Sequence, residues 1–350
     1  MSRRGGIFLI VVAVVGSGQF TNDLSARAVR PPMTSSVFTA GPTIPGSTCP
    51  VFPANNVWNT PITDLPVNSH SSTWLASMSA STSFLHPDYG PSGDVKHPYG
   101  IPWNIVPAQT AFTHVSFQYS SESDHVLYPL TAHTPIEGGS DRHALMVEPL
   151  KGASSAACTL YETFATHYRS GGHSTAGSGA VWNLQSNALR TAGFTSADAA
   201  GLPILPGLVK YNEVVAGTLH HAIRFTVNCT HDSYVWPARH HAGVADPTCP
   251  PMGARFRLDA LFTLPSSQCG PHCQSILTTM KTYGLIVADN GSNWFFQGTA
   301  DSRWTNGDVD QLKQIPANAF VAVDESCLMQ STNSGAAWQA GSVQYQNRCG

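Results

Sequence analysis

Carboxylic acids in strand-like segments are the residues of this sequence best suited to general acid and base catalysis. Hydrolysis of a glycosidic bond usually needs two carboxyl groups facing one cleft, one protonated to assist the leaving group and one ionised as nucleophile or base. Most aspartates here lie in turn-like segments, and the predicted catalytic residues are the three acids Glu148, Glu162 and Asp259. Glu148 and Glu162 are the first choice, because a hairpin would place them on neighbouring strands. In the alternative interpretation, Glu148 and Asp259 only neutralise arginines on an exposed sheet.

Basic and aromatic side chains are the candidates for substrate binding. Aromatic planes can cover the apolar face of a sugar while polar groups bind its hydroxyls, and arginines can bind carboxylates. The predicted binding residues are Arg142, His220, Arg224, Arg257, Trp182, Trp236 and His240. Two further histidines, His143 and His221, fall on the apolar sides of their segments and are interpreted as hydrogen-bonded core residues.

The segment between Cys229 and Cys249 is predicted to be a functional loop, because it lacks hydrophobic periodicity and gathers histidines, aromatic residues and an arginine. Its histidines could suggest a metal, but the sequence has neither an HExxH motif nor a His-x-His pair with a carboxylate, so no metal site is predicted. Fingerprints of serine hydrolases, P-loops and dinucleotide folds are missing as well, and no cofactor is expected.

Alternation of apolar and polar residues predicts the strands that would position these side chains. In 219–227, Leu219, Ile223 and Val227 share one side, and 254–262 repeats the pattern. These segments predict an antiparallel sheet with one dry and one wet face, and Arg224 and Arg257 fall on the wet face. Segments 142–148 and 159–167 predict a hairpin, and 284–298 predicts another around an Asn-Gly turn. Helices are expected over 71–79 and 269–283.

The composition favours a β-rich, loop-rich protein. Charged residues make up 11% of the 350 residues, against about 25% in a typical soluble protein, and the chain has 30 glycines and 25 prolines. The predicted fold is mainly β, an antiparallel β-sandwich of jelly-roll type with a few short flanking helices. The net charge of −3 and the lack of a basic run exclude a nucleic-acid partner.

Four regions are expected along the chain. Residues 1–28 resemble a signal peptide, with Arg3 and Arg4 before the short apolar run Ile7–Val15. A Pro/Ser/Thr-rich linker follows over 29–48, then a single β-sandwich domain over 49–328 and a tail over 329–350. The mature protein is expected to be a secreted monomer that does not bind membranes.

Eight cysteines follow the signal segment, an even number that favours disulfides in an oxidising compartment. Spacing alone does not determine connectivity. The preferred pairs, chosen by proximity, are Cys229 with Cys249, Cys269 with Cys273 and Cys327 with Cys349, the last of which would tie down the tail.

Several segments together resemble a group of secreted bacterial proteins associated with β-rich carbohydrate-active enzymes. They are AGSGAVWNLQSNALR, TSADAAGLPILPGLVKYNEV, HHAIRFT, WPARHH and KTYGLIVADNG, and the resemblance extends over most of the mature chain. It implies a bacterial source and a single β-sandwich domain, and it assigns no role to any residue.

The favoured hypothesis is a secreted enzyme that acts on a polysaccharide or oligosaccharide, a glycoside hydrolase with a carboxylate pair in a sheet-face groove. One alternative is a polysaccharide lyase, in which Arg142, Arg224 and Arg257 bind uronate carboxylates while a Tyr or His removes a proton. Another is a carbohydrate-binding or cell-surface protein without turnover. Two carboxyl groups about 5–10 Å apart in a groove would favour the hydrolase.

Overall fold

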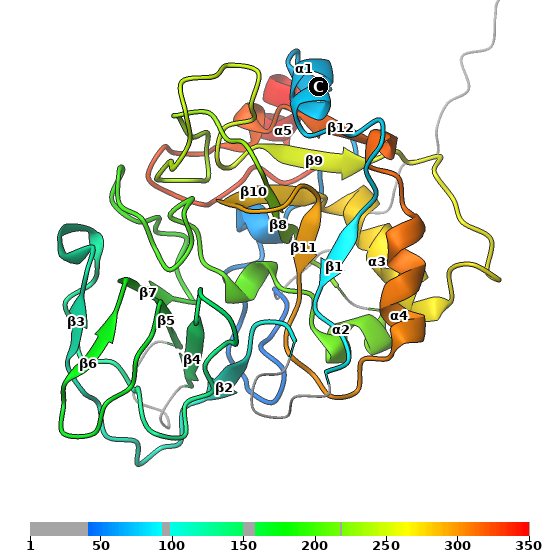
Figure 1. Cartoon of the computed structure of the whole chain (residues 1–350). Helices are drawn as coiled ribbons and strands as arrows, with labels where there is room; N and C mark the ends of the chain where they lie inside the picture. The colour runs from blue at the N-terminus through cyan, green and yellow to red at the C-terminus, as the bar shows by residue number, and fades with distance from the viewer. Residues whose placement is uncertain (1–40, 93–98, 150–157, 218, 350) are drawn as a thin grey trace, which may run out of the picture. The chain divides into compact units, whose positions relative to one another are not determined.

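Three sheets form the framework of this chain (Figure 1). The largest has six strands in the order β1-β11-β8-β10-β9-β12, a second has the order β2-β4-β5-β7, and β3 pairs with β6. Their bounds are β1 His86–Asp88, β2 Trp103–Ile105, β3 Val115–Phe117, β4 Ala144–Glu148, β5 Thr159–Phe164, β6 Ser174–Ala176, β7 Ser178–Asn183, β8 Ile223–Val227, β9 Arg255–Leu258, β10 Leu285–Asn290, β11 Phe295–Gln297 and β12 Phe320–Val323.

The helices are short apart from one. They are α1 Ser71–Ser77, α2 Tyr211–Ala216, α3 Pro271–Thr282, α4 Asn306–Asp310 and α5 Val343–Cys349. Six 3-10 helices accompany them, namely η1 Val57–Asn59, η2 Ser120–Glu122, η3 Leu205–Gly207, η4 Gln311–Gln314, η5 Ala317–Ala319 and η6 Ser326–Leu328. The helices expected over 71–79 and 269–283 are confirmed as α1 and α3.

This computed structural model describes residues 41–92, 99–149, 158–217 and 219–349, all within the unit Val37–Gly350. The predicted signal peptide (1–28) and most of the predicted linker (29–48) lie outside the described residues. Residues 41–48 pack on the body of the fold, since Ile44 is fully buried. The segment after 328 also packs on it, through bridges between Asn56 and Ala336 and between Ala188 and Ser334.

The prediction of a sheet-rich chain with few helices is confirmed, because strand residues outnumber helical ones, 25% to 19%. The prediction of antiparallel sheets is confirmed only in part, because the sheets are mixed. Parallel pairs join β1 to β11, β8 to β10, β2 to β4 and β3 to β6. Alternation of apolar residues predicts a strand and its faces but carries no information on the direction of its neighbours.

Strand β8 shows a second difference from prediction. It lies between β10 and β11, so the hairpin expected over 284–298 does not form, and both of its strands pair with β8 instead. All five residues of β8 are buried, Arg224 included, so the predicted wet face is wrong for this strand. The hairpin predicted from 142–148 and 159–167 is confirmed as the antiparallel pair β4 and β5.

Arginines on the predicted wet face of β9 are buried or half-buried because backbone carbonyls accept their hydrogen bonds. Arg255 is 1% exposed and donates to the carbonyl oxygens of Val57, Thr60 and Tyr283 and to the Glu325 carboxylate. Arg257 donates through Nη1 to three carbonyl oxygens of the segment before α1, those of Ile62, Thr63 and Leu65. Guanidinium groups thus attach the N-terminal segment to the sheet.

Four disulfides link the eight cysteines. The three predicted pairs are confirmed, and Cys49 pairs with Cys158. Four disulfides fit a protein of an oxidising compartment. Among the described residues, no helix combines the length and the apolar character needed to cross a membrane.

Peptide mapping of the non-reduced protein should recover these four links and no free thiol. The Cys49–Cys158 bridge closes the longest loop, with a sequence separation of 109. Replacing both of its cysteines by alanine should lower the free energy of unfolding by about 4–5 kcal/mol on the chain-entropy estimate. Urea denaturation of the double variant measures this loss, and a change below about 1 kcal/mol would contradict the estimate.

Candidate functional site

A cavity of about 470 Å³ lies where the two larger sheets meet four connecting segments. Its wall is built from residues far apart in the sequence: Tyr119, Glu122, Asp141, Phe164, Ser178, Thr195, Ser196, Ala197, Asp198, Ala199, His240, His241, Ala242, Asp289 and Asn290. Four of these residues are carboxylic acids, so we refer to it as the acidic cavity. Its volume falls in the range typical of ligand sites, about 300–1,000 Å³.

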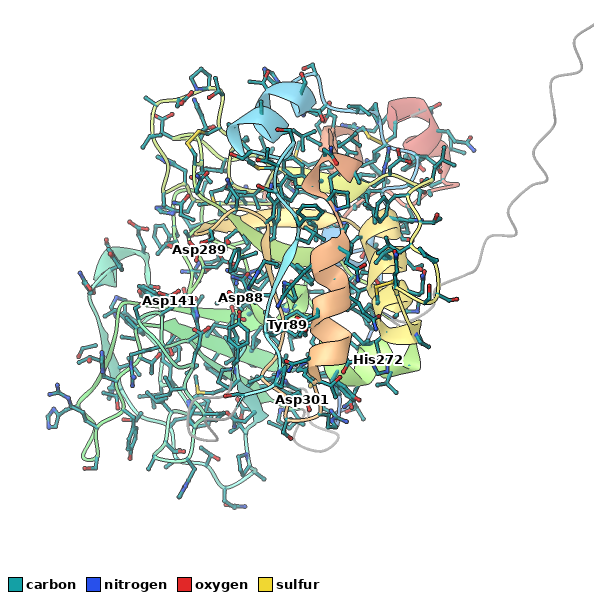
Figure 2. All side chains as sticks on the ribbon, turned by 45° about the vertical axis from the view of Figure 1, so that its right-hand side comes forward. Asp88, Tyr89, Asp141, His272, Asp289 and Asp301 are labelled. Carbon is teal, nitrogen blue, oxygen red and sulfur yellow. A yellow bond between two sulfur atoms is a disulfide. The ribbon has the colours of Figure 1, made fainter. Side chains whose placement is uncertain are left out.

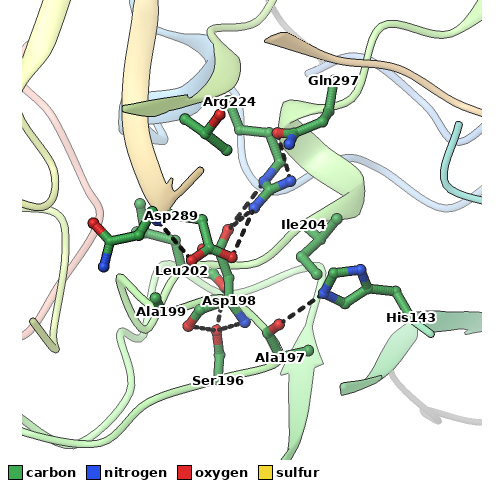
Figure 3. Close-up of polar contacts among 12 residues, drawn as sticks. His143, Ser196, Ala197, Asp198, Ala199, Leu202, Ile204, Arg224, Asp289 and Gln297 are labelled. Carbon is green, nitrogen blue, oxygen red and sulfur yellow. Dashed lines mark hydrogen bonds and ion pairs between the residues drawn. The ribbon is translucent and has the colours of Figure 1, made fainter. Parts of the chain in front are cut away.

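Asp198 is the buried acid of this cavity (Figure 3). Its side chain has no exposed area. Its Oδ2 accepts a hydrogen bond from Nε of Arg224 at 3.0 Å and forms an ion pair with Nη2 of the same residue, also at 3.0 Å. Its Oδ1 has no hydrogen-bond partner among the described residues. Burial raises the pKa of Asp198 to about 7, although the charge of Arg224 opposes the rise.

Asp289 is the accessible acid beside it. It lies near the end of β10, after a register shift between Val287 and Asp289, and its side chain is 27% exposed. Its Oδ2 lies 3.8 Å from Nη2 of Arg224, and its Oδ1 accepts the backbone N–H of Asn290 at 2.8 Å. Burial raises the pKa of Asp289, Arg224 acts in the opposite direction, and the charge of Asp141 adds to the rise.

The two acids share one cation. Arg224 makes two short contacts to Asp198 and one longer contact to Asp289, and its Nη1 donates to Oε1 of Gln297 at 2.6 Å. The single positive charge of one guanidinium does not balance the negative charges of two neighbouring carboxylates. The pair therefore titrates as a unit, with one proton retained more tightly than on a free carboxyl group.

His143 positions the loop that carries Asp198. Its Nδ1 lies 2.5 Å from Oε2 of Glu137, and its Nε2 lies 3.1 Å from the carbonyl oxygen of Ala197, to which it donates (Figure 3). Burial would lower the pKa of His143, but the hydrogen bond and charge of Glu137 outweigh it, so the pKa lies above its ordinary value. The sequence-based interpretation of His143 as a hydrogen-bonded buried residue agrees with these contacts.

The remaining wall of the acidic cavity is half-exposed. Oε2 of Glu122 accepts the backbone N–H of Thr195 at 3.0 Å and lies 3.7 Å from Nε2 of His240. His240 donates through Nδ1 to the carbonyl oxygen of Ala199 at 2.7 Å, and its ring stacks on His241 at a centroid distance of 5.8 Å. Asp141, labelled with Asp289 in Figure 2, is exposed and precedes β4.

Among the predicted site residues, two belong to this region. His240 lines the acidic cavity, and Arg224 contacts its two buried or half-buried acids. Sequence reasoning interpreted Asp289 as a turn residue and did not nominate Asp198 or Glu122. One signal for Asp289 was present in the sequence: the run LIVAD (285–289) is an apolar strand that ends in this acid. Such an acid is a candidate because ligand sites gather at the carboxyl ends of parallel strands.

The predicted pair Glu148 and Glu162 lies on β4 and β5, but the two residues are not brought together. Glu162 is opposite Leu145, and Glu148 is opposite Thr159. Glu162 is fully buried and accepts the backbone N–H groups of Ile204 and Leu205 and Nε1 of Trp182. Burial raises its pKa while these hydrogen bonds lower it, and the carboxyl group anchors η3 to β5.

The other predicted residues lie elsewhere. Glu148 accepts the Tyr161 hydroxyl at 3.1 Å, and Asp259 is exposed after β9 and accepts the backbone N–H of Leu261. Arg142 donates through Nε to the carbonyl oxygen of Thr166. His220 lines separate cavities of about 170 Å³ and 430 Å³, and Trp236 lines another of about 240 Å³. Neither Trp182 nor Arg257 lines the acidic cavity.

Burial of Asp198 predicts a pH-dependent stability. Its pKa is 3.8 as a free side chain and about 7 in the fold, so between about pH 4 and 7 the folded chain binds more protons than the unfolded one. The contribution of Asp198 to the free energy of unfolding therefore falls as pH rises through this window. We therefore expect the difference between the Tm of Asp198→Asn and the Tm of wild type to become more positive from pH 4.5 to pH 7.5.

Thermal unfolding across this range, with the exposed-site variant Asp259→Asn as control, measures the trend. The control should follow wild type at every pH. A Tm difference for Asp198→Asn that is constant over the window would show that the buried carboxyl group titrates normally.

No protein-family model, no curated protein and no solved structure matches this chain. Its function is therefore inferred from the acidic cavity alone.

Proposed function

We propose that this chain is a glycoside hydrolase whose active site is the acidic cavity. One observation carries the proposal: three accessible carboxylic acids, Glu122, Asp141 and Asp289, line a single ligand-sized cavity, and burial raises the pKa of one of them, Asp289. A protonated and an ionised carboxyl group facing one cleft is the arrangement that glycoside hydrolysis requires.

Asp289 acts as the general acid. Burial raises the pKa of both Asp198 and Asp289, and Asp289 is the member of the pair that is partly exposed where it lines the cavity, so it is the one that can pass a proton to a substrate. In the reaction the Asp289 proton passes to the glycosidic oxygen as the bond from that oxygen to the anomeric carbon breaks. Arg224 then stabilises the carboxylate that remains.

Glu122 acts as the second carboxylate. The Thr195 N–H and the neighbouring His240 fix Glu122 at the cavity wall. In the inverting route it accepts a proton from the attacking water, and proton exchange with solvent then restores both carboxyl groups. In the retaining route it bonds to the anomeric carbon, and a water deprotonated by Asp289 then displaces it from that carbon, which restores both groups. The anomeric configuration of the first product distinguishes these routes.

Aromatic groups of the acidic cavity suit a sugar ring. Tyr119, Phe164 and the stacked pair His240 and His241 line it, and they offer flat surfaces to the apolar face of a pyranose. The proposal does not require the jelly-roll arrangement expected from the sequence, which stays a prediction. The four disulfides support action outside the cytoplasm. That the protein acts as a monomer stays part of the proposal.

A lyase acting on uronates has less support. Among the residues that the structure describes, neither a lysine nor an arginine lines the acidic cavity. Arg142 and Arg257 donate to backbone carbonyls, and Arg224 is buried behind Asp198. In the described part of the chain, no lysine or arginine is therefore placed to bind a uronate carboxylate beside the candidate catalytic groups.

Incubating the purified protein with a panel of neutral, amino and uronate glycans tests the proposal. Release of reducing ends without an unsaturated product is the expected result. Accumulation of an unsaturated product would instead identify a lyase. Binding without any product over the whole panel would overturn the enzyme assignment in favour of a carbohydrate-binding protein.

A further inference from the structure

We propose that the acidic cavity selects glycans that carry protonated amines, amino sugars with a free amine, over neutral and uronate glycans. This inference deepens the proposed function and depends on it for the ligand being a sugar. It is carried by the charges around the cavity and by one unsatisfied acceptor in its wall.

Carboxyl groups are the main polar groups of the cavity wall. Glu122, Asp141, Asp198 and Asp289 line it, and no lysine or arginine of the described chain does. A cationic group entering the cavity would meet carboxyl groups on several sides, whereas an anionic group would be repelled by them. In a partly buried site, such electrostatic complementarity gives selectivity between ligands of similar shape.

His240 and His241 line the cavity, with Nε2 of His240 3.7 Å from Oε2 of Glu122, and the basic side chains that contact the wall from behind are paired. Arg224 is bound to Asp198 and Gln297, and Arg190 donates through Nη1 to Asp124. His143 has Glu137 as its partner. These cations offset part of the negative charge from behind the wall, but none of them lines the cavity and competes for a ligand there.

An independent observation concerns Asp198. Its Oδ1 is buried and has no hydrogen-bond partner among the described residues, although Asp198 contributes to the cavity wall. A buried acceptor without a donor is costly. Because the Asp198 side chain has no exposed area, a ligand N–H donor reaches this oxygen only if the wall moves locally. An ammonium group brings three such donors together with a positive charge.

The decisive experiment compares binding of three oligosaccharides of equal length: a glucosamine oligomer, its N-acetylated counterpart and a galacturonic acid oligomer. Calorimetry on the wild-type protein should give an affinity for the glucosamine oligomer about tenfold or more above that for the N-acetylated one. The uronate oligomer should bind most weakly. Equal affinities, or tighter binding of the uronate, would overturn the proposal.

Matched variants locate the effect. Asp141→Asn removes one negative charge from an exposed position of the wall and keeps an oxygen that can accept the Ser140 hydroxyl. It should reduce the affinity for the glucosamine oligomer several-fold more than the affinity for the N-acetylated oligomer. Asp259→Asn, which removes an exposed charge outside the cavity, should change neither. Equal losses in both aspartate variants would show a general charge effect and contradict the site.

A failure of the amine selectivity can be told apart from a failure of the proposed hydrolase activity, because the calorimetry measures binding and does not require cleavage. Preference for the glucosamine oligomer without cleavage of any glycan would retain the amine selectivity and refute the hydrolase. Cleavage of glycans without any preference for the amine would do the opposite. A free polyamine in a fourth calorimetric titration distinguishes the source of the amine: binding as tight as that of the oligomer would show that the sugar is not recognised.

Discussion

Replacing Asp289 by asparagine is expected to lower kcat for glycan hydrolysis by about 10²–10⁴-fold, the usual contribution of a positioned general acid. Asparagine preserves the shape of the side chain and can still accept the backbone N–H of Asn290, but it has no proton to give to the leaving group. Substrate affinity should change much less than kcat. Steady-state kinetics on the best substrate of the panel measures both quantities.

Two further measurements exclude a trivial loss of activity. The Asp289→Asn protein should unfold at a temperature close to that of wild type, because the side chain is 27% exposed. A substrate with a very acidic leaving group needs little protonation and should be cleaved by the variant at a rate much closer to wild type. If both substrates lose activity equally, Asp289 does not act as the acid.

Replacing Arg224 by methionine is expected to give the largest loss of stability, about 3–5 kcal/mol in the free energy of unfolding. Arg224 is 1% exposed, and its guanidinium contacts Asp198, Asp289 and Gln297. Its loss leaves two acids in the interior without their cation. Urea denaturation at pH 7 measures the change.

A double variant and a surface control make this test specific. Adding Asp198→Asn to Arg224→Met removes the uncompensated buried acid, so the double variant should be more stable than the sum of the two single losses predicts. Lys313→Met breaks an exposed pair with Asp310 and should cost less than about 1 kcal/mol. An Arg224→Met protein as stable as the Lys313→Met protein would show that the buried ion pair contributes little.

Local patterns predicted much of the secondary structure, because alternation and spacing are local properties. Helix α3, the β4–β5 hairpin and three disulfides follow from residues close in sequence. The pairing of β10 with β8 does not, because two strands separated by β9 and α3 give no sign of their mutual direction. The segment around Asp289 was therefore interpreted as a hairpin turn, although it is one wall of the acidic cavity.

The candidate site was predicted only in part for a related reason. Arg224 was nominated as a surface residue of a wet face, yet it contributes from the buried interior through Asp198. Glu162 was nominated as an acid in a strand, but backbone N–H groups of η3 occupy its oxygens. Whether a strand carboxyl group is a structural acceptor or an accessible acid depends on which distant loop covers it.

The order of the strands has a consequence for how the chain reaches its native state. Strand β1 pairs with β11, and the bridge from Val67 to Val323 joins segments from near the two ends of the described chain. Such contacts of high sequence separation form slowly, because the closure of long loops precedes any gain from pairing. An incomplete chain emerging from the ribosome lacks the strands that complete its largest sheet. Its largest sheet therefore stays incomplete until β12 has been synthesised, although β1 is made much earlier.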